Sequence, residues 1–253
     1  MSATLPDKLQ TLVRIARAAG VVVMQHYEAG CEAREKSDRS PVTDADEDAE
    51  KIILAELALA FPGVPVVAEE QAAAGHVVMV GTHFFLVDPV DGTKEFVKRG
   101  GEFTVNIGEI VDGRPVAGVV FAPAIGRLFV GGEGDGAFEI SGDGMKTIAA
   151  RPAPADGLVA VSSRSHPDPK TAQYLATLNI KGQTNAGSSL KFCLVAAGEA
   201  DIYPRAGTTM EWDTAAGHAV LAAAGGTVTT WDGAPFVYGK PGFTNGHFIA
   251  RGR

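Results

Sequence analysis

Two carboxylates three residues apart, Asp88 and Asp91, end an apolar run abruptly and are followed by Gly92 and Thr93. Hard divalent cations bind carboxylate and carbonyl oxygens, and an Asp-Pro-x-Asp turn can aim both carboxylates and the intervening Val90 carbonyl at one point. Gly92 lets the backbone approach a ligand closely. If a helix opens at Thr93, its free N–H groups can receive a phosphate oxygen. The spacing predicts a cation and phosphate site, and for this motif alone an acidic turn that caps a helix is the alternative.

Further acids stand at the ends of other predicted elements. Glu69 and Glu70 follow the apolar run Val64–Ala68, Asp213 lies at a predicted helix start, and Asp46 lies in the first turn of another. Each has a plainer interpretation. Glu70 would be solvent-exposed, Asp213 would be an N-cap, and acids near Asp46 favour the positive end of a helix. Asp46 also sits three residues after a threonine, as in a capping box.

The motifs together resemble the inositol monophosphatase superfamily of metal-dependent phosphatases. They occur in the family's order over nearly the whole chain, at residues 42–46, 69–70, 88–93 and 212–216. Three more segments narrow the resemblance to the bacterial 3′(2′),5′-bisphosphate nucleotidases, namely residues 101–107, 163–166 and 187–193. The resemblance implies a layered α-β-α-β-α sugar-phosphatase-like fold.

The resemblance also implies roles for individual residues. Two or three Mg²⁺ ions would be held by Glu69, Asp88, the Val90 carbonyl, Asp91 and Asp213. Thr93, hydrogen-bonded to Asp46, would polarise the nucleophilic water, and the Gly92 and Thr93 amides would hold the transferred phosphate. The implied substrate-binding set is Glu69, Val90, Asp91, Gly92, Thr93, Ser163, Arg164, Ser188, Lys191 and Asp213. The resemblance also implies that lithium inhibits the protein.

The predicted function is magnesium-dependent hydrolysis of the 3′-phosphate of adenosine 3′,5′-bisphosphate to AMP and phosphate, in support of sulfur assimilation. Phosphoadenylyl sulfate, converted to adenylyl sulfate, is a second candidate substrate. Arg164 and Lys191 offer two cationic donors for a second phosphate. Two alternatives stay open: a phosphatase of inositol-1-phosphate or another sugar phosphate, and a non-catalytic protein that senses nucleotides or metals. For residues 187–191 alone, a helix cap with a solvated Lys191 is also possible.

Periodicity predicts the elements that must position these residues. Helical spacing indicates helices over 6–28 and from Thr43 to Ala60, and an antiparallel meander follows to about residue 140. Beyond residue 151, short strands alternate with helices, which is typical of an α/β layer. The predicted fold class is therefore α+β / α/β. Residues 1–150 form a helix-flanked domain with a mainly antiparallel sheet and most metal ligands, and residues 151–253 form a smaller α/β domain with Asp213 and the nucleotide-binding residues.

Composition excludes several classes of protein. The 253 residues carry a net charge of −8 and 45% of them are hydrophobic. This composition argues against a disordered chain and against a nucleic-acid polymer as the partner. Six histidines without metal-binding spacing disfavour zinc, and residues 131–134 lie in a meander, which disfavours a dinucleotide loop.

No transmembrane segment or secretory signal is visible. The two cysteines fit a reduced, cytoplasmic setting. Peripheral attachment to the inner membrane and the oligomeric state stay open.

Overall fold

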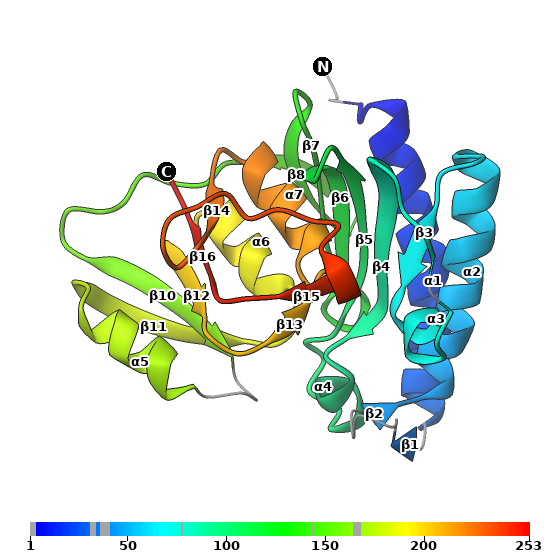
Figure 1. Cartoon of the computed structure of the whole chain (residues 1–253). Coiled ribbons are helices and arrows are strands. Elements are labelled where there is room, and N and C mark those ends of the chain that lie inside the picture. The colour runs from blue at the N-terminus through cyan, green and yellow to red at the C-terminus, as the bar shows by residue number, and fades with distance from the viewer. Residues whose placement is uncertain (1–3, 31–33, 36–40, 77, 143, 164–167) are drawn as a thin grey trace.

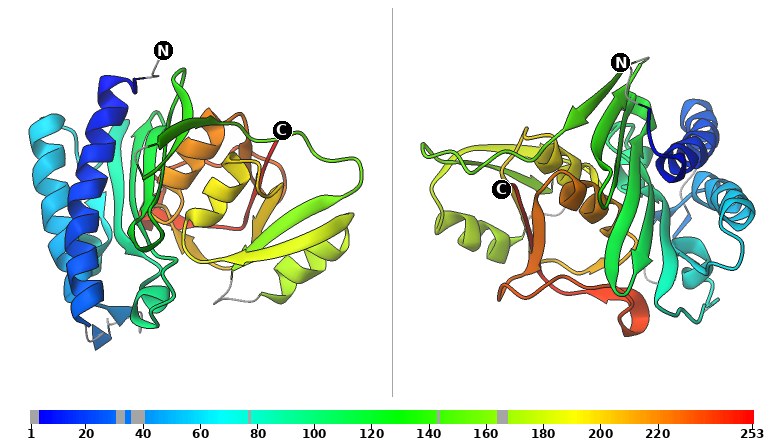
Figure 2. Two further views of the ribbon diagram at one scale, coloured as in Figure 1. Left: turned by 180° about the vertical axis from the view of Figure 1, so that it is seen from behind. Right: turned by 90° about the horizontal axis from the view of Figure 1, so that it is seen from above.

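The structure is a computed structural model that describes residues 4–30, 34–35, 41–76, 78–142, 144–163 and 168–253. Its layers follow one another as helices, sheet, helices, sheet and helix (Figures 1 and 2). The first layer contains α1 (Asp7–Ala29) and α2 (Asp44–Ala60), and the third contains α6 (Leu190–Ala196) and α7 (Ala215–Ala223). The last contains α5 (Pro169–Ala176). The predicted α-β-α-β-α arrangement is confirmed.

The second layer is a seven-stranded sheet with the order β3-β4-β5-β6-β7-β8-β9. Only the β3–β4 pair is parallel, and every later pair is antiparallel, as predicted. Two short helices, α3 (Glu69–Ala73) and α4 (Thr93–Val97), follow β3 and β4. The strands are β3 Val66–Ala68, β4 His83–Asp91, β5 Thr104–Val111, β6 Arg114–Ala122, β7 Arg127–Gly132, β8 Gly136–Ser141 and β9 Gly144–Ile148.

The fourth layer is a five-stranded mixed sheet with the order β11-β10-β12-β16-β14. Its strands are β10 Leu158–Ser163, β11 Ile180–Ala186, β12 Ile202–Arg205, β14 Thr227–Thr230 and β16 Phe248–Arg251. Two-stranded pairs complete the structure: β1 (Arg34–Glu35) with β2 (Pro41–Val42), and β13 (Thr209–Met210) with β15 (Thr244–Asn245). Single 3₁₀ turns occur at Pro123–Ile125 and Pro241–Phe243. The division into domains at residue 150 stays a prediction.

Helical periodicity explains how the first layer packs. On α2, Ala49, Ile53 and Leu57 lie on one buried face, in one apolar cluster with Phe85 and Val87 of β4. Burial of an aliphatic side chain of this size contributes about 1.5–3 kcal/mol. The same face carries Asp46 and Glu50 near its N-terminal end, so the packing of α2 brings two carboxylates against the sheet.

Two local predictions differ from the structure. The Asp-Pro-x-Asp segment is not a turn. It is the irregular end of β4, where the pairing with β5 shifts register between Asp88 and Asp91. An extra-residue irregularity of this kind re-aims side chains at a strand end. Strands β9, β11 and β16 were not predicted, because β9 and β11 are mostly exposed and lack a clear apolar alternation.

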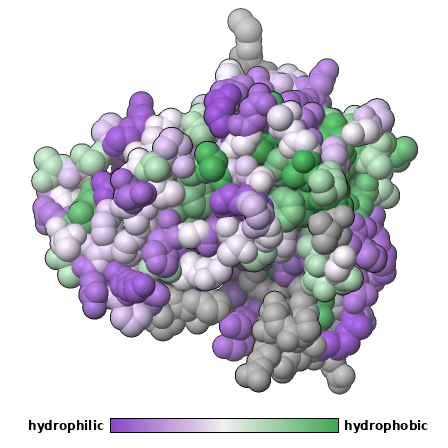
Figure 3. Space-filling model, in the orientation of Figure 1, coloured by the Kyte–Doolittle hydropathy of each residue, from purple (hydrophilic) through white to green (hydrophobic). Residues whose placement is uncertain are grey.

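Hydropathy differs between the two ends of the face shown in Figure 3. Hydrophilic and weakly apolar side chains mix over the end that carries β10, β11 and α5, whereas apolar side chains gather over parts of the opposite end. Leu59 and Met79 are among the exposed large apolar residues. Neither lines the polar pocket described below.

A row of glycines sets the distance between α7 and the seven-stranded sheet. Gly108, Gly118 and Gly131 are register partners on β5, β6 and β7. A Cβ atom on Gly118 would lie 2.6 Å from the Ala216 carbonyl oxygen, and one on Gly108 would lie 2.8 Å from the Ala216 nitrogen. Helix α7 can therefore rest directly on the strand backbone only because these positions have no side chain.

We expect Gly118→Ala to lower the free energy of unfolding, because the added methyl group meets helix backbone that cannot move aside. Overpacking of this kind costs typically about 1–3 kcal/mol. The matched control is Gly182→Ala on β11, where the nearest atom to an added Cβ is a valine methyl at 3.7 Å. Urea unfolding measures both variants. Equal stability of the Gly118 and Gly182 variants would contradict the proposed close contact.

Candidate active site

The carboxyl ends of β3 and β4 bring two predicted metal ligands together. Ala68 and Val87 are register partners in the parallel pair, so the next residues, Glu69 and Asp88, lie at the same edge of the sheet. Asp213 joins them from the second half of the chain. One carboxylate oxygen from each of Glu69, Asp88 and Asp213 lies within 4.8 Å of the other two. Three carboxylates from separate parts of the sequence therefore face one point, as a metal site requires.

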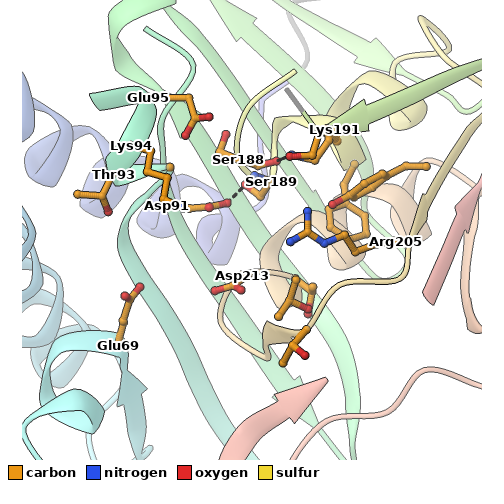
Figure 4. A pocket seen from close by; sticks show the side chains of 17 residues that line it. Glu69, Asp91, Thr93, Lys94, Glu95, Ser188, Ser189, Lys191, Arg205 and Asp213 are labelled. Carbon is orange, nitrogen blue, oxygen red and sulfur yellow. Dashed lines mark hydrogen bonds between the residues drawn. The ribbon is translucent and has the colours of Figure 1, made fainter. Parts of the chain in front are cut away.

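Asp213 does not cap a helix, although its position before an apolar helical stretch made an N-cap the plainer prediction. Helix α7 begins at Ala215 with Thr214 as its N-cap residue. The Asp213 Oδ2 atom instead accepts a hydrogen bond from the Met210 N–H at 2.8 Å. The carboxylate is thus held by the chain that precedes it, and it points into the same space as Glu69 and Asp91 (Figure 4).

Asp91 lies beside this group and is held by the segment before α6. Its Oδ2 atom accepts a hydrogen bond from the Ser189 N–H at 2.5 Å (Figure 4) and another from Asn106 Nδ2 at 3.4 Å. The Ser189 hydroxyl also donates to Asn106 Oδ1 at 2.6 Å. Asn106 is fully buried and Ser189 nearly so. The predicted metal roles of Asp91 and of the Val90 carbonyl stay predictions.

Burial makes the carboxylates electrostatically costly. Desolvation, with repulsion from neighbouring acids, raises the pKa of Asp88 and of Asp213 well above the usual range. Burial also raises the pKa of Asp91 to about 6, against the opposing effect of Lys191. A divalent cation offsets such repulsion. The donor set consists of oxygen atoms only and suits Mg²⁺.

Asp46 uses its two oxygens differently. Oδ2 accepts hydrogen bonds from the Thr43 N–H at 2.8 Å and the Thr43 hydroxyl at 2.7 Å, and the predicted capping box is present. Oδ1 lies 3.5 Å from the Thr93 hydroxyl, which also lies 3.2 Å from the Val90 carbonyl oxygen. Capping and contact with Thr93 are therefore compatible, although the Thr93–Asp46 separation is at the outer limit of a hydrogen bond.

These groups open into a cavity of about 340 Å³ whose lining includes the cations Lys94, Lys191 and Arg205 as well as the acids. Glu69 and Thr93 lie on one side of the pocket, and Lys191 and Arg205 lie on the other (Figure 4). Lys191 is 4% exposed, so the alternative of a merely solvated Lys191 is wrong. Burial lowers its pKa to about 8.

Backbone oxygens and an aromatic ring hold Lys191 in place. Its Nζ donates to the carbonyl oxygens of Ala186 and Ser188 and lies 5.3 Å from the centre of the Tyr203 ring. Ser188 has a positive φ of 49°, which is uncommon for a residue other than glycine. Ser163 and Ser188 both line the cavity. Arg164, the other predicted cation, lies outside the described residues.

Arg205 is a pocket cation that sequence reasoning missed. It ends β12, and its Nε atom is buried without a hydrogen-bond partner among the described residues. A second cavity of about 570 Å³ shares Ser163 and Arg205 with the first and is lined partly by apolar residues such as Leu175. The sequence did contain a signal for Arg205, because this residue lies just beyond a predicted strand, as Glu69 does.

The fold and this site match a known class of protein. A model of the inositol monophosphatase family matches residues 6–251, and the chain belongs to this family. It is similar to the 3′(2′),5′-bisphosphate nucleotidase CysQ of Salmonella typhimurium, with 46% identity over 91% of this chain and 93% of that protein.

Two solved structures are similar over nearly the whole chain. CysQ from Bacteroides thetaiotaomicron, described as a bacterial member of the inositol monophosphatase family, has 36% identity and a TM-score of 0.81 over 97% of both chains. An IMPase of Thermotoga maritima has 25% identity and a TM-score of 0.80 over 97% of this chain and 92% of that one. Within the described residues, no helix combines the length and apolar character needed to cross a membrane.

Magnesium is expected to raise the melting temperature more at about pH 7.5 than at about pH 5. The folded-state pKa of Asp91 (about 6) lies above the usual unfolded value of about 3.9. Protonation of Asp91 therefore makes its full contribution to the free energy of unfolding below pH ~4. That contribution is lost as the pH rises through about 6, and only ionised carboxylates gain from a cation. Saturation to about 100 times Kd contributes about 2.7 kcal/mol, which corresponds to a shift of several degrees.

Thermal melts with and without Mg²⁺ at the two pH values measure this difference. The control is Asp213→Asn, which removes one charge of the group and is expected to reduce the shift at the higher pH. An equal shift of the melting temperature by magnesium at both pH values would contradict the electrostatic account. No shift at either pH would contradict the predicted metal site.

Proposed function

We propose that this protein is a magnesium-dependent phosphatase that removes the 3′-phosphate of adenosine 3′,5′-bisphosphate and releases AMP and phosphate. One observation carries the proposal: a single pocket joins a cluster of buried and half-buried carboxylates to the cations Lys191 and Arg205 on its other side. The similarity to CysQ nucleotidases supports the same reaction. An inositol or sugar monophosphate would use the carboxylate side but would leave the two cations without a second phosphate.

The carboxylates are proposed to hold Mg²⁺ through Glu69, Asp88 and Asp213, with Asp91 and the Val90 carbonyl as further ligands. When bound, Mg²⁺ would neutralise phosphate charge and lower the pKa of the attacking water. The backbone contacts described above orient the acids for this task. Val90 N–H, for example, donates to Asp88 Oδ1 at 3.0 Å and leaves Oδ2 directed elsewhere.

The Thr93 hydroxyl is proposed to orient the nucleophilic water. It would accept a proton from this water and pass the hydroxyl proton to Asp46. The Thr93 oxygen contacts both the Asp46 carboxylate and the Val90 carbonyl, so its proton has two acceptors within 3.5 Å. The N–H groups of Gly92 and Thr93 are proposed to bind the transferred phosphate. Gly92 has φ of 90°, and an added Cβ would lie 3.3 Å from the Glu102 carbonyl oxygen, which favours glycine here.

The remaining 5′-phosphate is proposed to bind between Lys191 and Arg205, with Ser163 and Ser188 nearby. The second cavity, which begins at Ser163 and Arg205, is proposed to receive the nucleoside, because apolar residues such as Leu175 form part of its lining. Phosphoadenylyl sulfate carries the same 3′-phosphate and is proposed as a second substrate. Sulfur assimilation, inhibition by lithium and a cytoplasmic location belong to the same proposal.

Substrate preference is expected to depend on Arg205. Phosphate release with Mg²⁺ is compared for adenosine 3′,5′-bisphosphate, inositol-1-phosphate and 5′-AMP, and the bisphosphate should be preferred with 5′-AMP left intact. Because hydrogen bonds to charged groups contribute about 1.5–3 kcal/mol, Arg205→Gln should raise KM for the bisphosphate roughly 10–100-fold.

The control for charge is Arg114→Gln, which removes an exposed arginine outside this pocket. Its KM should match that of the wild type. Preference of the wild-type protein for inositol-1-phosphate would overturn the substrate proposal while leaving the metal site intact. An unchanged KM in Arg205→Gln would remove Arg205 from the phosphate site.

Thr93→Ala is expected to lower kcat by about 10²–10⁴-fold, the range typical of a lost proton-transfer group, while Thr93→Ser retains most activity. The reason is that serine keeps the hydroxyl between Asp46 and Val90. Magnesium titration of the melting temperature should give the wild-type affinity in both variants. Thr208→Ala, at another threonine of the pocket, serves as the control. Wild-type turnover in Thr93→Ala would remove the proposed proton path.

A further inference from the structure

Glu50 is a buried carboxylate that the proposed reaction does not use. It lies on α2, and its side chain is 4% exposed. Its Oε2 atom accepts a hydrogen bond from the Glu70 N–H at 2.7 Å, and its Oε1 atom accepts one from the Gln71 N–H at 3.0 Å. Both donors belong to the first turn of α3, directly after Glu69.

These two N–H groups are the ones that an N-cap side chain normally satisfies. The N-cap residue of α3 is Ala68, whose side chain has no acceptor, and alanine is a poor residue for this position. Glu50 provides the missing acceptor from another helix with both of its oxygens. Because hydrogen bonds to an ionised acceptor are short and strong, they fix where α3 begins relative to α2.

The start of α3 also carries one of the three clustered carboxylates, Glu69, which lies near Asp88 and Asp213. Glu69 is the first residue of α3, and β3 ends one residue earlier beside Val87. Glu50 lies one helical turn after Asp46, on the same buried face of α2. That face therefore contacts Thr93 through Asp46 and the segment after Glu69 through Glu50.

We infer that Glu50 is a positioning residue for the metal site: through its two hydrogen bonds to α3 it holds Glu69 in place and thereby sets the affinity for Mg²⁺. The inference rests on the proposed metal-dependent function. Partners that orient metal ligands typically contribute about 10–100-fold in affinity or activity. Glu50→Gln keeps the size of the side chain but places an NH₂ group against one of the two N–H donors, so one hydrogen bond is lost.

The experiment measures Mg²⁺ affinity of the full-length protein by titrating the melting temperature with Mg²⁺ alone, and separately measures kcat and KM for the bisphosphate against Mg²⁺ concentration. Glu50→Gln should weaken Mg²⁺ affinity about tenfold and raise the half-activating Mg²⁺ concentration equally. At saturating Mg²⁺, KM for the nucleotide should stay within about twofold of the wild type, because Glu50 does not touch the substrate pocket.

Two control variants separate positioning from other effects. Glu139→Gln removes an equally buried glutamate on β8, 4% exposed and paired with Arg127 and Lys146. It should lower stability without changing Mg²⁺ affinity. Glu50→Asp keeps the charge but shortens the reach to α3, so it should weaken Mg²⁺ binding as Glu50→Gln does. Wild-type affinity in Glu50→Asp, with weak binding in Glu50→Gln, would assign the effect to charge and overturn the inference.

The outcomes also distinguish this inference from the proposed function. Absence of Mg²⁺ binding by the wild-type protein would remove the metal site itself. Wild-type binding with unchanged affinity in Glu50→Gln would overturn only the role of Glu50. If the Glu50 variants do not fold, hydrogen exchange of the wild-type protein decides. The Glu70 and Gln71 amides should exchange slowly without Mg²⁺, and fast exchange of both would overturn the inference.

Discussion

Repulsion between buried carboxylates is the constraint on which the rest of the site depends. Acids that repel one another do not stay together unless each is held from outside the group. In this fold each aspartate gives one oxygen to a backbone N–H and keeps the other free of that bond. The pairs are Asp88 with Val90, Asp91 with Ser189, and Asp213 with Met210. Glu69 is placed differently, by the helix that it begins. The backbone thus supplies the orientation that mutual attraction cannot supply.

The layered fold makes this arrangement possible because the acids come from separate segments, namely the start of α3, the end of β4 and the residues before α7, each with its own anchor. The parallel pair β3–β4 brings Glu69 and Asp88 to one edge of the sheet. Asp213 precedes α7, which rests on the backbone of three strands at the glycine row. Any side chain at Gly118 would clash with the backbone of α7, the helix that follows Asp213. The sheet therefore determines the position of the site as well as the stability of the chain.

Much of the fold and of the site could be predicted from local sequence patterns. The rest depends on contacts between segments that are distant in the chain. The long helices, the strand ends at Glu69 and Asp88, and the Thr43–Asp46 cap follow from periodicity and short spacings. Arg205 and Glu50 do not, because Arg205 lines a pocket built from distant segments and Glu50 binds the backbone of another helix. Asp213 shows why a sound local rule can fail. Its spacing suits an N-cap, but a nearer donor, Met210 N–H, takes the carboxylate.

The pocket also explains how an acidic chain can receive a substrate with two phosphates. The net charge of −8 repels anions overall, so attraction must be local. Lys191 is buried among carbonyl oxygens and beside Tyr203, and desolvation lowers its pKa to about 8. A phosphate beside it would favour its charged form, as a cation would favour the ionised carboxylates opposite. Both sides of the pocket thus carry desolvated charges that a ligand of the opposite sign would stabilise. On the carboxylate side that ligand would be a divalent cation, which a phosphate could then bind, and on the other side it would be a second phosphate beside Lys191 and Arg205.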